Sequence, residues 1–190
     1  MKQTLKNLSK AFIGESQARN RYTFYSRIAE KEGYEQIAEI FLITADNEKA
    51  HAKRLFEHIQ ELKKTEKEIA VESSASITYG TTEENLQAAI EGENYEHTEM
   101  YPQFAEVAEK ENLPLISKRL KAIAIAEKHH EERFKKLLKQ IKAETTFRKE
   151  QEMEWVCREC GYLHIGTSAP EKCPSCDHPQ AFYQIKCEEY

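Results

Sequence analysis

Residues 114–144 read PLISKRLKAIAIAEKHHEERFKKLLKQIKAE, and this stretch decides the fold. Large side chains recur at alternating steps of four and three, which is the spacing of one face of a helix in an antiparallel bundle. Two successive positions on this face are polar, Glu127 and His130, so a surface that should be buried carries a carboxylate and an imidazole. The full face is Ile116, Leu120, Ile123, Glu127, His130, Phe134, Leu137 and Ile141.

Three earlier stretches, at about 4–31, 34–64 and 82–110, also have helical periodicity. Turn signals at Gly33 and at residues 112–114 join the four helices into two antiparallel hairpins. The link at 65–82 is long and contains the non-helical string ESSASITYGTT, which indicates a crossover between the hairpins. The sequence therefore predicts an all-α four-helix bundle with one long crossover. The face expected for the third helix is Leu86, Ile90, Glu93, Met100, Phe104 and Val107.

The polar residues on these faces repeat between the two hairpins. The pair Glu48 and His51 has the same E-x-x-H spacing as Glu127 and His130, at an offset of 79 residues. Single glutamates, Glu15 and Glu93, precede the two pairs at similar distances. One E-x-x-H on a charged helix usually consists of two solvated side chains, but a repeated set on buried faces is hard to explain in that way. An unpaired carboxylate in a core costs several kcal/mol, and a divalent cation relieves that cost.

One glutamate from each of two helices, with an E-x-x-H pair from each of the other two, is the ligand pattern of di-iron carboxylate bundles. The sequence thus predicts a dinuclear metal site. His129 lies about 200° around the helix from Glu127 and should face away. Glu96 and His97 both flank the Glu93 face; periodicity alone slightly favours His97, and it leaves the choice between them open.

The C-terminal part has a different composition, reached through a charged tract at 144–154. Two C-x-x-C pairs lie twelve residues apart there, and four thiolates suit Zn²⁺ or a single iron. Spacing alone favours zinc, whereas the neighbouring dinuclear site favours iron. Cys187 is left over and is expected to be a free thiol. The four ligands are Cys157, Cys160, Cys173 and Cys176.

Composition excludes several classes of partner. The net charge of −5 gives no electrostatic basis for binding nucleic acid or an anionic membrane. The N-terminal residues lack the apolar region of a signal peptide, and no stretch is apolar enough for a membrane span. We therefore expect a soluble cytoplasmic protein.

Over nearly its whole length the chain resembles the rubrerythrin family, through GESQARNRY, ADNEKAHA, GENYEHTEMYP, AEKHHEER, CRECGY and CPSC in that order. The resemblance implies a ferritin-like di-iron four-helix bundle at 1–146 and a rubredoxin-like domain at 147–190 that holds one iron on four cysteines. It also implies a peroxidase that reduces hydrogen peroxide to water and protects against oxidative stress. The expected assembly is a homodimer or larger, and the expected electron donor is a rubredoxin or an NAD(P)H-dependent reductase.

Carried over by position, the resemblance selects Glu96 rather than His97 and implies that Glu48 and Glu127 bridge the two irons. It further implies that His51 holds one iron in the reduced state and Glu96 replaces it in the oxidised state, which makes these two the catalytic residues. Tyr22 and Tyr101 resemble tyrosines that hydrogen-bond to the site carboxylates. The implied di-iron ligands are Glu15, Glu48, His51, Glu93, Glu96, Glu127 and His130.

One residue departs from the family pattern. Rubredoxin-type knuckles usually end in glycine, but here Asp177 follows Cys176. We expect a different backbone turn in the second knuckle.

Three other functions compete with the peroxidase. Iron oxidation and storage would use the same bundle but would not need the cysteine module. A zinc-ribbon adaptor on a helical scaffold would leave the buried ligands unexplained. An oxidase that reduces O₂ is a closer competitor, which the sequence leaves open.

Overall fold

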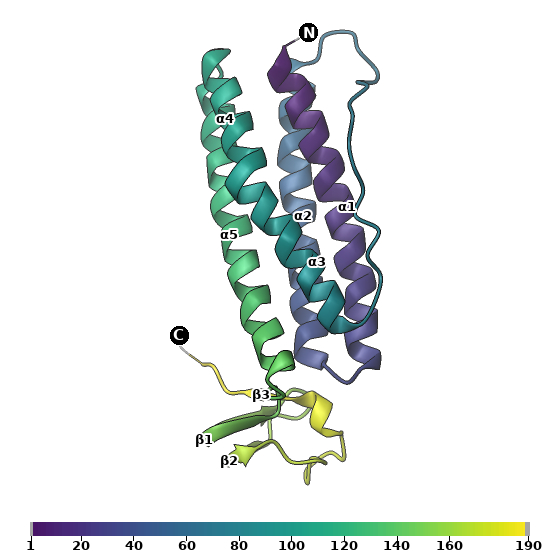
Figure 1. Ribbon diagram of the computed structural model, residues 1–190, viewed down its shortest axis with the longest axis vertical. Helices are drawn as coiled ribbons and strands as arrows, with labels where there is room; N and C mark the ends of the chain where they lie inside the picture. Colours follow the sequence, from purple (N-terminus) through teal and green to yellow (C-terminus); the bar gives the residue numbers. More distant parts are fainter. Residues whose placement is uncertain (1, 189–190) are drawn as a thin grey trace.

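Residues 2–188 are described by a computed structural model, in which long helices run side by side and a small sheet lies at one end of them (Figure 1). The third helical segment is continuous but changes type, from α3 through the π-helical turn η1 into α4. The prediction of a four-helix bundle with one long crossover is confirmed. The helical elements are α1 (Gln3–Lys31), α2 (Glu35–Leu62), α3 (Thr82–Tyr95), η1 (Glu96–Met100), α4 (Tyr101–Lys110) and α5 (Pro114–Lys142).

The two hairpin turns have the same construction. Gly33 and Asn112 take the left-handed conformation, with φ of 81° and 58°, which glycine and asparagine adopt at low cost. In each turn the next residue donates its N–H to a carbonyl five residues back, Tyr34 to Ala29 at 2.8 Å and Leu113 to Ala108 at 2.9 Å. This is the Schellman motif, and its recurrence supports the internal repeat seen in the sequence.

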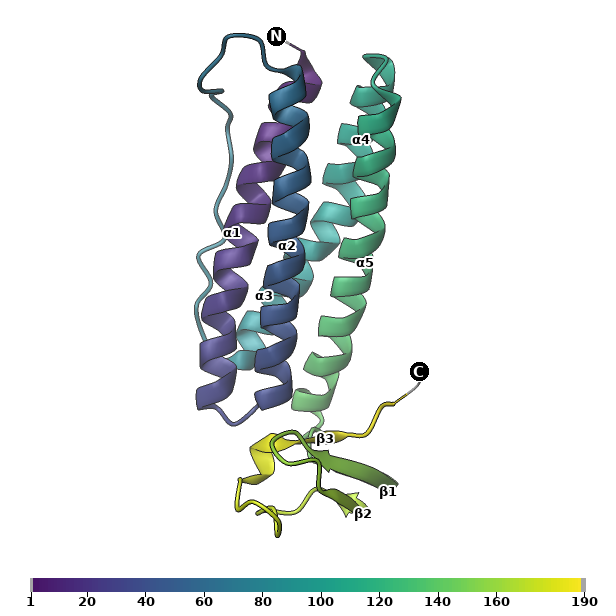
Figure 2. The ribbon, with the colours of Figure 1, turned by 180° about the vertical axis from the view of Figure 1, so that it is seen from behind.

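The crossover runs along the outside of the bundle beside α1 in both views (Figures 1 and 2). Tyr25 fastens it there by donating its hydroxyl to the Thr78 carbonyl at 2.8 Å. A capping box then starts α3: Thr81 Oγ1 accepts the Glu84 N–H at 3.2 Å, and Glu84 Oε2 accepts the Thr81 N–H at 2.8 Å.

The apolar core of the bundle is divided into two layers by a polar band. On α2, Phe41 belongs to one layer and Leu55 to the other, and the buried Glu48 lies between them. On α5, Phe134 and Ile123 flank Glu127 in the same way. The polar residues therefore sit in the middle of the bundle, with hydrocarbon on both sides.

The face predicted for the end of the third helix is wrong by one residue. Phe104 is only partly buried, whereas Ala105 and Ala108 are fully buried. The cause is η1, because a π-helical turn contains one more residue than an α-helical turn and shifts every later side chain around the axis.

The C-terminal module is a small antiparallel sheet with strand order β2-β1-β3. Trp155 is fully buried in its core and donates its indole N–H to the Gly166 carbonyl at 2.9 Å. Most of the charged tract at 144–154 is strand rather than connection, since β1 starts at Arg148. The elements are β1 (Arg148–Cys157), β2 (Leu163–Ser168), the 3₁₀ turn η2 (Gln180–Phe182) and β3 (Tyr183–Ile185).

The module packs against the end of the bundle that carries the α1–α2 turn (Figures 1 and 2). The rings of Tyr34 and Phe147 stack there with centroids 6.2 Å apart and an interplanar angle of 4°. Arg158, inside the first cysteine knuckle, pairs with Glu39 of α2 at 2.6 Å. Within residues 2–188 no helix has the length and apolar character needed to cross a bilayer.

The capping box gives a test of the fold. Thr81→Ala removes the acceptor for the Glu84 N–H and should lower the free energy of unfolding by about 1 kcal/mol. Chemical denaturation followed by circular dichroism measures this. Thr65→Ala, at an exposed threonine in the crossover, is the control and should have little effect. Equal stability of the two variants would show that the cap does not stabilise the start of α3.

Candidate metal centre

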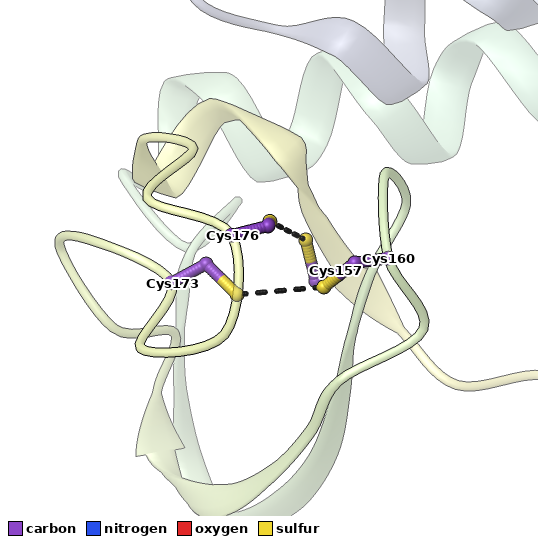
Figure 3. Close-up of side chains that lie close together, drawn as sticks. All are labelled: Cys157, Cys160, Cys173 and Cys176. Carbon is purple, nitrogen blue, oxygen red and sulfur yellow. Dashed lines mark hydrogen bonds between the residues drawn. The ribbon is translucent and has the colours of Figure 1, made fainter.

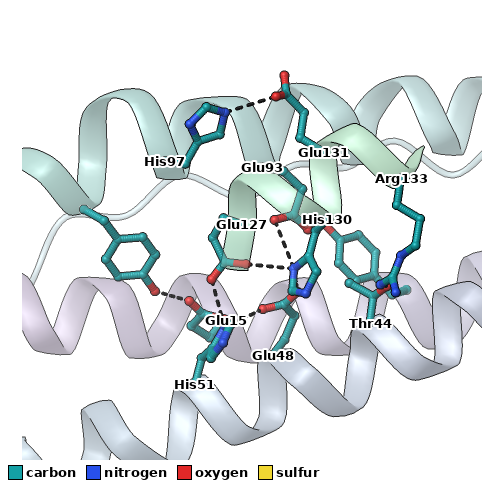
Figure 4. A network of polar contacts seen from close by, with 12 residues as sticks. Glu15, Thr44, Glu48, His51, Glu93, His97, Glu127, His130, Glu131 and Arg133 are labelled. Atoms are coloured by element: carbon teal, nitrogen blue, oxygen red, sulfur yellow. Dashed lines mark hydrogen bonds and ion pairs between the residues drawn. The ribbon is translucent and has the colours of Figure 1, made fainter. Parts of the chain in front are cut away.

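Six of the predicted di-iron ligands converge in the polar band of the bundle (Figure 4). They come from four helices, and the four glutamates are at most 1% exposed. Helical spacing produces this arrangement, because residues three apart project from nearly the same side and each E-x-x-H pair therefore faces inward together. The six are Glu15 on α1, Glu48 and His51 on α2, Glu93 on α3, and Glu127 and His130 on α5.

These side chains form two groups that share two carboxylates. In the first, His51 Nδ1 lies 2.8 Å from Glu127 Oε1, 3.2 Å from Glu48 Oε2 and 3.7 Å from Glu15 Oε2. Glu48 and Glu127 each turn their other oxygen to the second group.

The second group repeats these distances. His130 Nδ1 lies 2.8 Å from Glu127 Oε2, 3.1 Å from Glu48 Oε1 and 3.6 Å from Glu93 Oε2. Each shared carboxylate therefore presents one oxygen to each group, which is the arrangement of a bridging ligand.

Two tyrosines orient the unshared glutamates, each from the opposite hairpin. Tyr22 of α1 donates its hydroxyl to Glu93 Oε1 at 2.5 Å, and Tyr101 of α4 donates to Glu15 Oε1. Each hydrogen bond occupies Oε1 and leaves Oε2 in the site without a partner. The hydrogen bonds expected of these two tyrosines are confirmed.

The residues fit a pair of divalent metal ions. Ligand atoms about 2.1 Å from one metal and at right angles to each other are about 3 Å apart, close to the shorter distances in both groups. The buried atoms Glu48 Oε1, both carboxylate oxygens of Glu127, and His130 Nδ1 have no hydrogen-bond partner in spite of these short contacts. Buried polar atoms are seldom left unpaired, so their convergence on a common centre indicates a site for cations.

Without metal, the buried carboxylates oppose one another's ionisation. Burial, followed by the charge of Glu48, raises the pKa of Glu93 to about 8 and raises the pKa of Glu15 well above its ordinary value. Burial also opposes ionisation of Glu48, but contacts with His130 and His51 lower its pKa to about 2. Metal ions would relieve this competition by favouring the ionised form of every carboxylate.

Glu96 and His97, between which periodicity could not choose, have different environments. His97 points away from the metal groups, and its Nε2 lies 3.1 Å from Glu131 Oε2 on α5 (Figure 4). Glu96 belongs to neither group, but its carboxyl is close enough for the charge of Glu15 to raise its pKa, after the larger effect of burial. The structure thus has His51 in the site and Glu96 beside it.

The sequence prediction for His129 is confirmed. His129 is exposed and faces away from the site. His58 lies on α2 outside both metal groups, and its Nδ1 is 2.9 Å from Glu61 Oε2.

Two polar residues near the site were missed from the sequence. Glu131 is buried and accepts hydrogen bonds from Asn94 and His97. Arg133, one turn after His130, donates to Thr44 Oγ1 at 2.6 Å. Both lie in the charged run HHEERF, which reads as a solvated surface, and no signal in the sequence separates them from their exposed neighbours.

The four cysteines of the module face one another (Figure 3). Cys157 Sγ lies 3.7 Å from Cys176 Sγ, and Cys160 Sγ lies 3.7 Å from Cys173 Sγ. Four sulfurs about 2.3 Å from a central metal in a tetrahedron are about 3.8 Å apart, so the set fits a single tetrahedral ion. Cys187 is exposed and lies outside this set.

The expectation of a different turn at Asp177 is wrong. Asp177 has φ of 62° and donates its N–H to the Cys173 carbonyl at 2.9 Å. Gly161 in the first knuckle has φ of 76° and donates to the Cys157 carbonyl at 2.8 Å. Aspartate is one of the residues that tolerate the left-handed conformation, so the two knuckles keep the same turn.

Comparisons with known proteins agree with this geometry. The sequence model described as Rubrerythrin matches residues 6–138, and the one described as Rubrerythrin, rubredoxin-like domain matches residues 155–184. A putative rubrerythrin of Methanocaldococcus jannaschii is 61% identical, with all of this chain and 96% of that protein covered. Rubrerythrin-1 of Clostridium acetobutylicum is 49% identical, with 98% and 96% covered.

Solved structures show the same architecture. Nigerythrin in a partially reduced state superposes with a TM-score of 0.65 at 30% identity, over 96% of this chain and 86% of that one. Symerythrin from Cyanophora paradoxa, at 20% identity, gives a TM-score of 0.58 over 71% and 82% of the two chains and supports the fold alone.

A carboxylate and histidine cluster inside a bundle with one long crossover defines a ferritin-like di-iron carboxylate protein. The chain belongs to the rubrerythrin family, whose members are generally di-iron proteins of oxidative stress with a rubredoxin-like domain. It has the residues for both iron sites of that family, the di-iron carboxylate cluster and the two cysteine knuckles.

The pKa values predict how pH affects the metal-free bundle. The pKa of Glu93 is about 8 in the folded state and about 4.3 in an unfolded chain, so the folded state binds more protons between these values and stability falls as pH rises. Burial lowers the pKa of His130, but contacts with Glu127 and Glu48 outweigh burial and raise this pKa to about 12. An unfolded histidine has a pKa of about 6.5, so His130 also makes stability fall as pH rises above about 6.5. The contribution of Glu48, whose pKa is lowered, is complete above about pH 4.3 and does not change in this range.

We therefore expect the melting temperature of the metal-free helices to drop by more than about 4 °C between pH 5 and pH 8. Iron(II) loading should reverse the trend, since its ligands must be deprotonated. Circular dichroism at a helical wavelength measures both. Parallel pH profiles with and without metal would contradict a metal site in the bundle.

Proposed function

We propose that this protein is a non-haem di-iron peroxidase that reduces hydrogen peroxide to water, with electrons delivered through the iron of the cysteine knuckles. The observation that carries the proposal is the combination of two ligand groups, joined by both oxygens of Glu48 and Glu127, with a one-electron site of four cysteines in the same chain. Reduction of H₂O₂ to two waters takes two electrons and two protons. An iron pair held by the two ligand groups would supply the two electrons, and an iron held by the four cysteines would return them singly.

Two tyrosines orient the candidate ligands and carry protons beside the site. Tyr22 and Tyr101 keep Glu93 and Glu15 turned toward the metal positions. Burial, followed by the neighbouring carboxylates, raises the pKa of both phenols well above the usual value, so each retains its proton next to the site. The two apolar layers exclude bulk water, which strengthens every electrostatic interaction between them.

Peroxide would enter on the side of His51. The His51 side chain is 17% exposed, whereas those of Glu15, Glu48 and Glu127 are at most 1% exposed. Glu96 is partly exposed as a residue, but its carboxyl lies where burial raises the pKa. His51, one of the two residues that the resemblance implies to exchange as iron ligands, is thus the residue of the first group that borders the solvent.

The alternatives differ in which oxidant they use. An oxidase would react faster with O₂, and an iron-storage protein would take up excess iron(II) without needing the cysteine site. The test is to reduce the iron-loaded protein anaerobically, mix it with H₂O₂ or with O₂, and follow the visible absorbance. We expect fast reoxidation by H₂O₂ and a rate with O₂ at least tenfold lower. Faster reaction with O₂, or zinc in the cysteine site and no reoxidation, would contradict the peroxidase.

Glu96→Ala tests the exchange of ligands. This variant should fold normally, because Glu96 belongs to neither metal group, but its peroxide turnover should fall at least tenfold, since the oxidised pair would lose an anionic ligand. Glu99→Ala, at an exposed glutamate of the same π turn, is the matched control and should retain full activity. Unchanged turnover in Glu96→Ala would rule out the exchange.

The family resemblance also supports three further proposals. We propose a homodimer or larger assembly, a cytoplasmic location, and a rubredoxin or NAD(P)H-dependent reductase as the electron donor. The ligand assignments and the domain limits at 1–146 and 147–190 are likewise proposals.

A further inference from the structure

A π-helical turn, η1, interrupts the helix that carries Glu93, Glu96 and Tyr101. Its last backbone bond joins the Tyr101 N–H to the Glu96 carbonyl five residues back. Such turns are rare, and they occur frequently at functional sites. Some interaction must therefore favour η1 over a regular helix.

The extra residue of the π turn brings Glu93 and Tyr101 to nearly the same side of the helix. In a regular α-helix, Glu93 and Tyr101 would point about 80° apart around the axis, whereas one added residue reduces the difference to about 20°. Both then face the same site, Glu93 as a candidate ligand and Tyr101 as the donor to Glu15. The geometry of the centre thus requires the π turn.

Two local features weaken the regular helix at this place. Pro102 has no N–H and cannot continue the helical hydrogen bonds. Thr98 Oγ1 donates to the Asn94 carbonyl at 2.6 Å and so satisfies a backbone acceptor through its side chain. These features permit a break, and both act within the helix itself.

Glu131 on α5 connects the helix that contains the π turn to the rest of the bundle through hydrogen bonds. Its Oε1 accepts Asn94 Nδ2 at 2.9 Å and its Oε2 lies 3.1 Å from His97 Nε2 (Figure 4), while Lys135 Nζ lies 2.7 Å from Oε1. Glu131 is only 4% exposed, and it is a buried carboxylate outside both metal groups. Its charge is balanced instead by these donors, two of which come from the helix that contains the π turn.

The two donors lie on either side of Glu96 in the chain, and Glu131 itself directly follows the ligand His130. We propose that Glu131 is a positioning residue: its hydrogen bonds to Asn94 and His97 fix the π turn to α5 and keep Glu96 and Tyr101 in register with the metal centre. The part that concerns Glu96 rests on the proposed function, and the part that concerns the π turn does not.

Hydrogen exchange of the iron-loaded protein tests the structural part. In Glu131→Ala, amides in residues 96–101 should exchange at least tenfold faster than in the wild type, while those of α1 and α2 keep their rates. His97→Phe should have a similar local effect. Amide exchange in the double variant should be no faster than in Glu131→Ala alone, since both substitutions remove the hydrogen bond between His97 and Glu131. Glu132→Ala, at the exposed neighbouring glutamate, is the control and should leave the region unchanged. If Glu131→Ala does not fold, His97→Phe carries the same test.

The Mössbauer spectrum of the oxidised iron tests the effect on the site. The di-iron signal should change in Glu131→Ala, while the signal of the cysteine-bound iron in the same sample stays constant. Exchange that is unchanged at 96–101, or raised equally along the whole chain, would overturn the proposal. If the wild type fails to react with peroxide, the proposed function fails while the exchange result still stands.

Discussion

The structure depends on one constraint, which is that four glutamates share the dry interior of a helix bundle. Each of them lost its hydration on folding, at a cost of several kcal/mol for an isolated carboxylate. The polypeptide provides only part of the compensation, through two histidines and two tyrosines. Divalent metal ions bound by these glutamates would supply the remaining positive charge, so the fold and the iron site depend on each other.

The internal repeat makes this site symmetric. Each hairpin contributes a single glutamate, an E-x-x-H pair and a tyrosine, and each tyrosine reaches the glutamate of the other hairpin. The two hairpins are therefore joined through the centre as well as through their apolar faces. The π turn breaks the symmetry, because among the described residues it occurs only in the second hairpin. At this turn the second hairpin has Glu96, where the first hairpin has the small Ala18.

Much of this was predictable from the sequence, because helical periodicity determines which residues share a face. It predicted the helices, the crossover and six converging candidate ligands, of which Glu127 and His130 are the clearest. It failed at Phe104, because a π turn changes the period and only Thr98 and Pro102 give any local sign of one. It also missed Glu131, since a buried glutamate in a charged run has the same sequence context as a solvated one. At Asp177 the expectation failed for another reason: the backbone required a left-handed residue, and aspartate can provide it.

The central claim is that the buried carboxylates bind two metal ions in addition to the one in the cysteine knuckles. The most direct measurement is Mössbauer spectroscopy of protein loaded with iron under anaerobic conditions, which separates iron bound by oxygen and nitrogen from iron bound by sulfur. The account predicts twice as much iron in the first environment as in the second. Iron found only in the sulfur environment, in a protein whose helices are fully folded, would contradict it.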